Sequence, residues 1–299
     1  MSHFVIQDAL YTAKLVSELE RLAIEQLNGP SMMLMKRAGR AAFDELIEAF
    51  GKPSLITVFC GSGNNAGDGY IVATLAAEKS IPVRIVELAS EGKLSADAAV
   101  ARDYALSAGV TMQSDDGSIE LSEGVIVDAL LGTGTKGPMR AAYVAAIDRI
   151  NQAGLPVLAI DLPSGLYADS GAIAEVAVRA DISVTFIAAK QGMFSGRGPA
   201  LCGEIIYHSL DVDEAIFQQV PGLAQLMNLD DLMKHLPVRD ADAYKNQFGH
   251  SLVIGGDHGF GGAALMAAEA ALRAGSGLVG TATRPTHVAA ALARQPEVM

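Results

Sequence analysis

Glycine, asparagine and aspartate residues gather directly after an apolar run at residues 55–59. The segment that follows, residues 60–70, has the sequence CGSGNNAGDGY. Glycines allow backbone N–H groups to approach an anion closely, and the first turn of a following helix adds the positive end of its dipole. A strand that ends in such a segment and continues as a helix predicts a loop that holds a phosphate group.

Two further segments of this kind follow later in the chain. Residues 127–134 have the sequence VDALLGTG, and residues 160–165 have the sequence IDLPSG. Each of the three segments follows an apolar run and carries carboxylate or amide oxygens. Open α/β sheets bind their ligands beyond the carboxyl ends of the strands. The three segments together therefore predict a nucleotide-type site at one edge of a sheet.

Asn65, Asp128 and Ser164 place one oxygen-bearing side chain in each of the three segments. A set of oxygen ligands suits a hard cation rather than zinc or copper. The spacing alone does not distinguish potassium from sodium. The six histidines and two cysteines of the chain lack metal-ligand spacing.

The composition excludes several classes of protein. The chain has 299 residues, half of them hydrophobic, which is enough for about two domains with full cores. Its net charge of −12 and the lack of a Lys/Arg run argue against a nucleic-acid partner. Residue 1 is not followed by a basic segment and an apolar stretch, and no run of 18 apolar residues occurs. We therefore expect a cytoplasmic protein without a membrane partner.

Alternating strands and helices are predicted to position these segments. Two helices come first, at residues 8–27 and 32–50. Strands rich in valine and isoleucine then alternate with helices of ten or more residues, which is typical of a parallel sheet covered on both faces. Strands are expected at residues 55–60, 83–88, 125–131, 157–161, 182–188 and 204–209, with helices at 67–80, 96–108 and 140–153. Residues 1–220 are thus predicted to form a mostly parallel, Rossmann-like three-layer α/β/α sandwich.

A second α/β unit is predicted near the end of the chain. Residues 221–250 are expected to be a linker with a short helix, and residues 251–299 the first βαβ unit of another domain. That unit consists of a strand, a glycine-rich turn, an alanine-rich helix and a second strand, at residues 251–254, 255–262, 263–274 and 277–282. A fragment of this size buries little surface by itself.

The three segments, together with residues 185–192 (TFIAAKQG), resemble the YjeF N-terminal family, the NAD(P)H-hydrate epimerases. The resemblance covers residues 1–220, with Ala66 where many members have glycine. Residues 255–279 are similar to the opening of the ADP-dependent NAD(P)H-hydrate dehydratase, a ribokinase-like domain that bacteria commonly carry on the same chain. The nucleotide-binding segment and catalytic aspartate of that domain are expected beyond residue 299. Residues 251–299 are therefore expected to be a truncated start without dehydratase activity.

The resemblance implies a substrate and a reaction. The substrate is NADHX or NADPHX, a nicotinamide nucleotide hydrated at ring carbon 6, and the reaction interconverts its R and S epimers. Inversion can proceed when the hydroxyl is protonated, the ring nitrogen expels water, and water returns to the other face; this requires an acid/base group. Asp161, at the end of an apolar strand, is the expected catalytic residue. The structural alternative is that Asp161 only caps the following turn.

The resemblance also implies what the site binds. Potassium is expected at Asn65, Asp128 and Ser164, and ADP or ATP with magnesium is expected for the full-length dehydratase. The structural alternative for the asparagine loop is an Asx-stabilised turn. The substrate is expected to contact Asn64, Asn65, Ala66, Gly67, Asp68, Gly132, Thr133, Gly134, Thr135, Lys136, Gly137, Pro138, Asp161 and Ala263.

Two other functions remain open from the sequence. The same fold resembles domains of eukaryotic decapping-enhancer proteins, where it is a non-catalytic scaffold for dimerisation and RNA contact. Intact Asp161, Asp128 and Asn65 and the acidic net charge argue against that use. A dinucleotide-dependent dehydrogenase would carry G-x-G-x-x-G and an acidic residue about 20 residues later, a pattern that the first segment matches only loosely. The two leading helices are compatible with a homodimer or a higher homo-oligomer.

Overall fold

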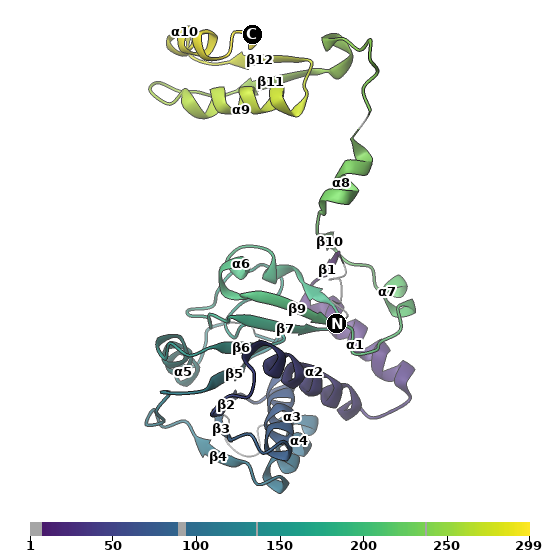
Figure 1. Cartoon of the computed structure of the whole chain (residues 1–299), viewed down its shortest axis with the longest axis vertical. Coiled ribbons are helices and arrows are strands. Elements are labelled where there is room, and N and C mark those ends of the chain that lie inside the picture. The colour runs from purple at the N-terminus through teal and green to yellow at the C-terminus, as the bar shows by residue number, and fades with distance from the viewer. Residues whose placement is uncertain (1–7, 89–93, 136, 237) are drawn as a thin grey trace. The chain divides into compact units, whose positions relative to one another are not determined.

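The computed structural model describes residues 8–88, 94–135, 137–236 and 238–299. The chain divides into two compact units, unit 1 up to Met227 and unit 2 from Asn228 to Met299, whose elements are labelled in Figure 1. The division lies inside the predicted linker. The predicted bounds 1–220, 221–250 and 251–299 themselves stay predictions.

A parallel sheet forms the centre of unit 1. Its seven strands lie in the order β4-β3-β2-β5-β6-β7-β9, and all neighbouring pairs are parallel. The edge strand β4 was not predicted, because its sequence TMQS is polar and mostly exposed and lacks an apolar pattern. The strands are β2 (Ile56–Cys60), β3 (Val83–Glu87), β4 (Thr111–Ser114), β5 (Val125–Ala129), β6 (Val157–Ile160), β7 (Ile182–Phe186) and β9 (Glu204–His208).

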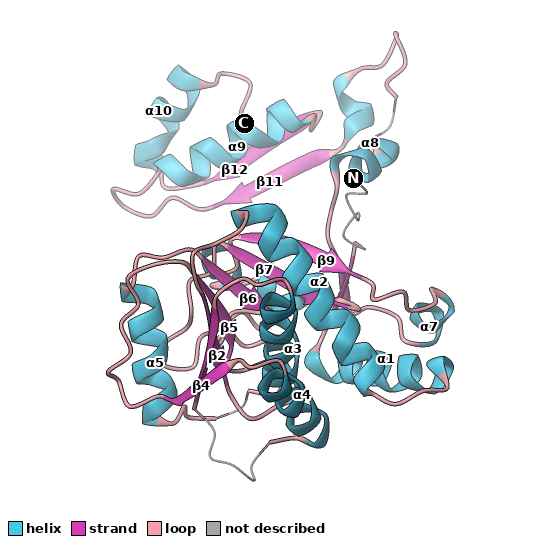
Figure 2. Ribbon diagram, turned by 60° about the horizontal axis from the view of Figure 1, so that its bottom comes forward, coloured by secondary structure: helices cyan, strands magenta, loops and turns pink. Residues whose placement is uncertain are grey.

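Helices cover both faces of this sheet, as Figure 2 shows. One face carries α2 (Met32–Phe50), α3 (Asn64–Glu78) and α4 (Ala96–Ser107), and the other carries α5 (Ala141–Gln152). Because both faces are covered, β2, β5, β6 and β7 are buried at every residue. The predicted α/β class and mostly parallel sheet are confirmed. The strand order reverses between β2 and β5, which is where such sheets bind ligands.

The first predicted helix, at residues 8–27, is wrong in its first turn. Residues Ala9–Tyr11 form β1, which pairs in parallel with β8 (Ala189–Lys190) and antiparallel with β10 (Ala224–Gln225). Helix α1 (Ala13–Leu27) begins only after Thr12, whose side chain accepts a hydrogen bond from the Leu15 N–H and caps the helix. The other short elements of unit 1 are η1 (Gln191–Met193), α6 (Gly198–Leu201) and α7 (Ala215–Gln219).

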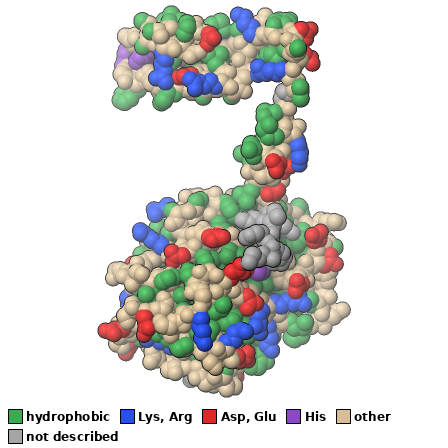
Figure 3. Space-filling view, in the orientation of Figure 1, with side chains coloured by type: hydrophobic (Ala, Val, Ile, Leu, Met, Phe, Trp, Pro, Cys, Tyr) green, Lys and Arg blue, Asp and Glu red, His purple; other side chains and the backbone are tan. Residues whose placement is uncertain are grey.

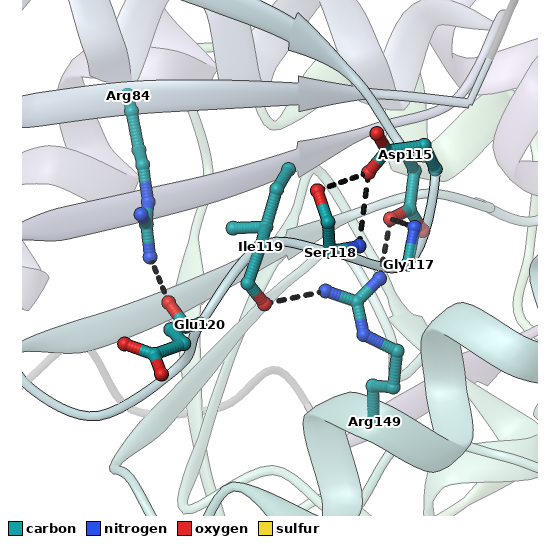
Figure 4. Close-up of polar contacts among 8 residues, drawn as sticks. Arg84, Asp115, Gly117, Ser118, Ile119, Glu120 and Arg149 are labelled. Atoms are coloured by element: carbon teal, nitrogen blue, oxygen red, sulfur yellow. Dashed lines mark hydrogen bonds and ion pairs between the residues drawn. The ribbon is translucent and has the colours of Figure 1, made fainter.

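Two arginines anchor the connection between β4 and β5 (Figure 4). Arg149 of α5 forms an ion pair with Asp115 and donates to the Ile119 carbonyl at 2.8 Å. Arg84 of β3 donates to the Glu120 carbonyl at 2.5 Å. These contacts fix the path of the connection, and Ile119 and Leu121 within it pack against the core beside α5.

The described residues of unit 2 contain the predicted βαβ arrangement, the short helix expected before it and two further helices. Its two strands, β11 (His250–Ile254) and β12 (Leu278–Ala282), are parallel. Its helices are α8 (Leu229–His235), η2 (Lys245–Phe248), α9 (Gly262–Ala274) and α10 (Pro285–Arg294). Its buried core is one small cluster, formed by Ala268, Val279 and Val298.

Acidic and basic side chains are interspersed on the face of the molecule drawn in Figure 3. Each helix in the part of the chain that the structure describes is too short or too polar to cross a lipid bilayer.

Candidate active site

The first predicted segment forms the N-terminal turn of α3. The helix begins at Asn64, after the extended residue Gly63, and not at Gly67 as predicted. It begins early because the Gly63 carbonyl already accepts hydrogen bonds from the Ala66 and Gly67 N–H groups. Asn64 is held from α4, where Ser95 Oγ donates to Asn64 Oδ1 at 2.7 Å. The predicted anion-binding loop is therefore the start of a helix, with free N–H groups at its end.

Close packing fixes this helix against the sheet. A Cβ atom at Gly69 would lie 2.5 Å from the Ala129 Cβ at the end of β5. A Cβ atom at Gly67 would collide with the Met35 side chain of α2. Glycine at these two positions lets α3 approach both neighbours, and this close approach brings Asn65 to the strand ends.

Asn65, Asp128 and Ser164 meet around the main chain of Leu131; we call these three residues the oxygen cluster. Ser164 Oγ donates to Asp128 Oδ1 at 2.6 Å, and the Ser164 N–H donates to Asp128 Oδ2 at 2.8 Å. Asn65 Nδ2 donates to the Leu131 carbonyl at 3.1 Å. The Leu131 N–H donates to Ser164 Oγ at 2.8 Å. One residue from each of the three segments thus contributes to a single polar centre.

The oxygen cluster is buried and has one acceptor without a hydrogen-bond partner among the described residues. Asp128 and Ser164 are fully buried, and burial raises the pKa of Asp128 to about 6 against the lowering effect of its hydrogen bonds from Ser164. Asn65 is buried too, and its Oδ1 lacks a hydrogen-bond partner among the described residues. An unpartnered buried oxygen is costly. A hard cation, which favours oxygen ligands, fits this environment.

Asp161 lies one residue beyond β6 in the left-handed region, with φ of 69°. Its N–H donates to the Val184 carbonyl at 2.8 Å, which holds the backbone in this conformation. A Cβ atom at Gly132 would lie 3.9 Å from Asp161 Oδ2 and 3.3 Å from the Asn65 Cβ. All three predicted segments therefore approach one another at Asp161. Non-glycine residues in this region are uncommon and cluster at functional sites.

Lys190 is a partner of Asp161 that was not among the expected site residues. Its Nζ forms an ion pair with Asp161 Oδ1 and donates to Thr185 Oγ1 at 2.9 Å and to the Phe186 carbonyl at 3.1 Å. The side chain is 1% exposed. Residues 185–192 carry a sign of this pair, because Lys190 stands in an apolar stretch. A lysine that is buried there almost always has an acidic partner.

Two more carboxyl groups face this part of the site. Glu20 of α1 and Asp68 of α3 line one cavity of about 90 Å³, together with Phe186. Burial and the charge of Asp161 raise the pKa of Glu20 to about 6, and the same two causes raise the pKa of Asp68 well above its usual range. Glu20 was missed from the sequence, although it follows the buried Val16 by four residues and so shares the buried face of α1.

The remaining predicted binding residues lie in two places. In unit 1, Thr135 Oγ1 donates to the Gly132 carbonyl at 2.9 Å, and the Gly137 carbonyl accepts from Tyr167 OH at 3.2 Å. Lys136 lies outside the described residues. Ala263 lies in the first turn of α9 in unit 2. The structure also describes Thr133, Gly134 and Pro138 beside these turn residues. The binding roles of all these residues stay predictions.

Comparison with known proteins matches two families to the chain. The model described as "YjeF-related protein N-terminus" matches residues 31–192, and the model described as "NAD(P)H-hydrate dehydratase" matches residues 251–299. The crystal structure of the yeast protein ynu0 covers 74% of this chain and 96% of its own, with a TM-score of 0.61 and 18% identity. This likeness shows a common fold.

The chain also resembles several longer proteins named bifunctional NAD(P)H-hydrate repair enzymes. The protein from Coxiella burnetii is 44% identical over 291 residues, which are 97% of this chain and 59% of the relative. The protein from Escherichia coli is 39% identical over 280 residues, which are 94% of this chain and 54% of the relative. The protein from Leishmania major is 37% identical over 303 residues, with 99% and 54% covered. The chain thus spans little more than half the length of these relatives.

Proposed function

We propose, because the chain belongs to the family of YjeF-related protein N-termini, that unit 1 is an NAD(P)H-hydrate epimerase. Its substrate is NADHX or NADPHX, and its reaction interconverts the R and S epimers at the hydrated ring carbon. The observation that carries this proposal is the ion pair of Asp161 and Lys190. It lies beside the oxygen cluster, at the carboxyl ends of the strands next to the point where the strand order reverses. The names of the longer relatives support it.

Asp161 is the residue that we assign to proton transfer at the ring hydroxyl. A proton from the pair of Asp161 and Lys190 goes to the hydroxyl, the C–O bond breaks, and the ring nitrogen lone pair forms a C=N bond as water leaves. Water then adds to the opposite face, and its proton returns to Asp161. Lys190 is fixed by Thr185 and Phe186, so it holds the Asp161 carboxylate in one position during both steps.

We assign a potassium ion to the oxygen cluster. Asn65, Asp128 and Ser164 would hold it, with main-chain oxygens of the neighbouring turn. The unpartnered Asn65 Oδ1 supports this assignment. The ion would supply positive charge near the substrate's phosphate groups.

The two alternative functions have weaker support. A scaffold does not need a buried ion pair of Asp161 and Lys190, and the relatives are named as enzymes. A dinucleotide-dependent dehydrogenase needs a strand-end carboxylate for the ribose. The carboxylate in that position, Glu87 at the end of β3, already accepts hydrogen bonds from Tyr70 OH at 2.7 Å and Arg102 Nε at 2.6 Å.

For unit 2 we propose a part in the dehydration of the S epimer, with ADP or ATP and magnesium as cofactors of the longer protein. The match of residues 251–299 to the dehydratase family supports this proposal. Ala263, in the first turn of α9, is our candidate for contact with the hydrate.

The test of the epimerase proposal uses the purified chain and one pure epimer of NADHX. The composition of the mixture is followed by chromatography in potassium buffer and in sodium buffer, and the spontaneous rate is subtracted. We expect acceleration in potassium that is smaller in sodium. No acceleration with either NADHX or NADPHX would refute the proposal.

A further inference from the structure

Two carboxyl groups beside the ion pair share the charge of Lys190 with Asp161. In the described part of the chain, Lys190 donates to three acceptors, and Asp161 is the one carboxylate among them. Among the described residues, Glu20 and Asp68 have neither a hydrogen bond nor an ion pair with their carboxyl groups. Among its described side chains, the site therefore contains more carboxyl groups than basic groups.

Apolar walls surround these two carboxyl groups. The cavity that they line is also lined by Ile24 of α1, Leu34 of α2 and Phe186 at the end of β7. Asp68 is partly buried and borders the cavity. Carboxylates in such a place are poorly solvated and unpaired, which is unfavourable until a cation or a hydrogen-bond donor enters. Both groups border the same cavity.

The proposed reaction generates a suitable cation. When water leaves the hydrated ring, positive charge develops on the ring nitrogen and carbon 6. A fixed negative group near that charge stabilises it without reorganisation of solvent. We propose that Glu20, with Asp68, lines the subsite for the hydrated nicotinamide ring and stabilises the ring cation, so that α1 contributes a functional residue to the site. This inference rests on the proposed epimerase function.

The test compares two glutamate-to-glutamine substitutions on the same helix. Glu20→Gln keeps the size and polarity of the side chain and removes its charge. Glu18→Gln is the matched control, because Glu18 lies on the exposed face of α1 and pairs with Arg21 at 2.7 Å. We expect Glu20→Gln to lower kcat roughly tenfold to a hundredfold with little change in KM. This loss lies at or below the low end of the effect of one preorganised electrostatic group. Glu18→Gln should keep both constants.

A binding readout tests the charge without turnover. NAD⁺ carries a positive nicotinamide ring and NADH a neutral one, and the two are otherwise alike. The affinity ratio of NAD⁺ to NADH, measured by calorimetry, should fall roughly tenfold in Glu20→Gln, because one nearby negative charge is lost. The ratio should be unchanged in Glu18→Gln.

A pH profile adds a signature that a merely structural role would not give. The groups that face Glu20 across the site are Asp68, Asp97, Asp161 and Lys190. Because the pKa of Glu20 is about 6, kcat of the wild type should rise with pH through that value as Glu20 becomes charged. Glu20→Gln should lose this rise and should melt at a higher temperature than the wild type at pH 7, since it no longer buries an unpaired charge.

The outcomes separate this inference from the proposed function. If the wild type accelerates epimerisation, and Glu20→Gln matches Glu18→Gln in kcat and in the NAD⁺ to NADH ratio, the role of Glu20 is refuted and the epimerase stands. If the wild type does not accelerate epimerisation, the proposed function fails. The binding ratio then still decides whether Glu20 faces the nicotinamide ring.

Discussion

Unit 1 and unit 2 begin their parallel sheets in similar ways but bury them to different extents. In both, an apolar strand leads through glycines into a helix, β2 into α3 and β11 into α9. Strand β2 is buried at every residue, whereas Leu252 and Ile254 of β11 are 62% and 78% exposed. In the described residues, the central parallel sheet of unit 1 has seven strands and the sheet of unit 2 has two.

The difference shows what converts a glycine-rich turn into a site. In unit 1 the neighbouring strands β5 and β6 end at the same edge as β2, and they bring Asp128 and Asp161 to the start of α3. The small residues Gly67 and Gly69 bring α3 close enough for Asn65 to join them. In the described part of unit 2, β12 is the one strand that pairs with β11. A glycine-rich turn therefore supplies backbone N–H groups, and the ends of adjacent strands supply the carboxylate side chains.

The largest expected effect is on the rate when the strand-end carboxylate of unit 1 is changed. Asp161→Asn should lower kcat for epimerisation by ~10²–10⁴, because the amide can accept a hydrogen bond from Lys190 but cannot exchange a proton. Epimer composition measured over time checks this. The matched control is Asp115→Asn, which alters the ion pair with Arg149 at the sheet edge in Figure 4 and should keep the rate. Wild-type turnover in Asp161→Asn would make Asp161 structural.

The next effect concerns the stability of unit 1. Lys190→Met should lower the free energy of unfolding by about 3–5 kcal/mol, because it leaves the partly buried Asp161 without its counter-charge. Denaturant titration measures the loss. The double variant with Asp161→Asn should recover part of it, since the uncompensated charge is then gone. If the losses of the single variants Lys190→Met and Asp161→Asn add up in the double variant, the two side chains are not energetically coupled.

Potassium should stabilise unit 1 through the oxygen cluster. At about 100 times its dissociation constant, the ion should add about 2.7 kcal/mol to the free energy of unfolding of the wild type. Asp128→Ala should abolish this gain, because it removes the carboxylate from the cluster. Thermal melts at rising potassium concentration, with choline as the inert cation, compare the two proteins. An equal response in both would remove the ion from the oxygen cluster.

The smallest expected effect comes from the exposed strand of unit 2. Ile254→Ala should change the free energy of unfolding by no more than about 0.5 kcal/mol, as is usual for exposed positions. Ile56→Ala, the matched change in the buried strand β2, should cost about 2–5 kcal/mol. Denaturant unfolding of both variants provides the comparison. A large loss for Ile254→Ala would mean that β11 is covered in solution.

The main elements of unit 1 could be predicted from the sequence because their apolar patterns are strong. Runs such as residues 157–160 are uninterrupted, and both faces of the corresponding strand are covered. Strand β4 could not be predicted, since its pairing is fixed by backbone bonds and by the anchored connection after it. Residues 9–11 also escaped prediction, because β1 is defined by its partners β8 and β10, which are distant in sequence.

The site was predictable where the chemistry lies in strand-end motifs. The segments with Asn65, Asp128, Asp161 and Ser164 stand out by their glycines and their position after apolar runs, and the structure brings all four together. Lys190 stands in an apolar stretch and Glu20 on the buried face of α1, but neither pattern indicates that the side chain lies near Asp161. Their proximity to Asp161 depends on the bend at Ile187, with φ of 62°, and on the packing of α1. Both are features of the tertiary structure.

The central claim is that unit 1 inverts the hydrated carbon by loss and return of water. The most direct measurement supplies one pure epimer of NADHX to the wild-type chain in water enriched in ¹⁸O and follows both epimers by mass spectrometry. The account predicts conversion faster than the spontaneous rate, with ¹⁸O in the hydroxyl of each newly formed epimer. Conversion no faster than in the enzyme-free control, or accelerated conversion that leaves the original oxygen in place, would contradict it.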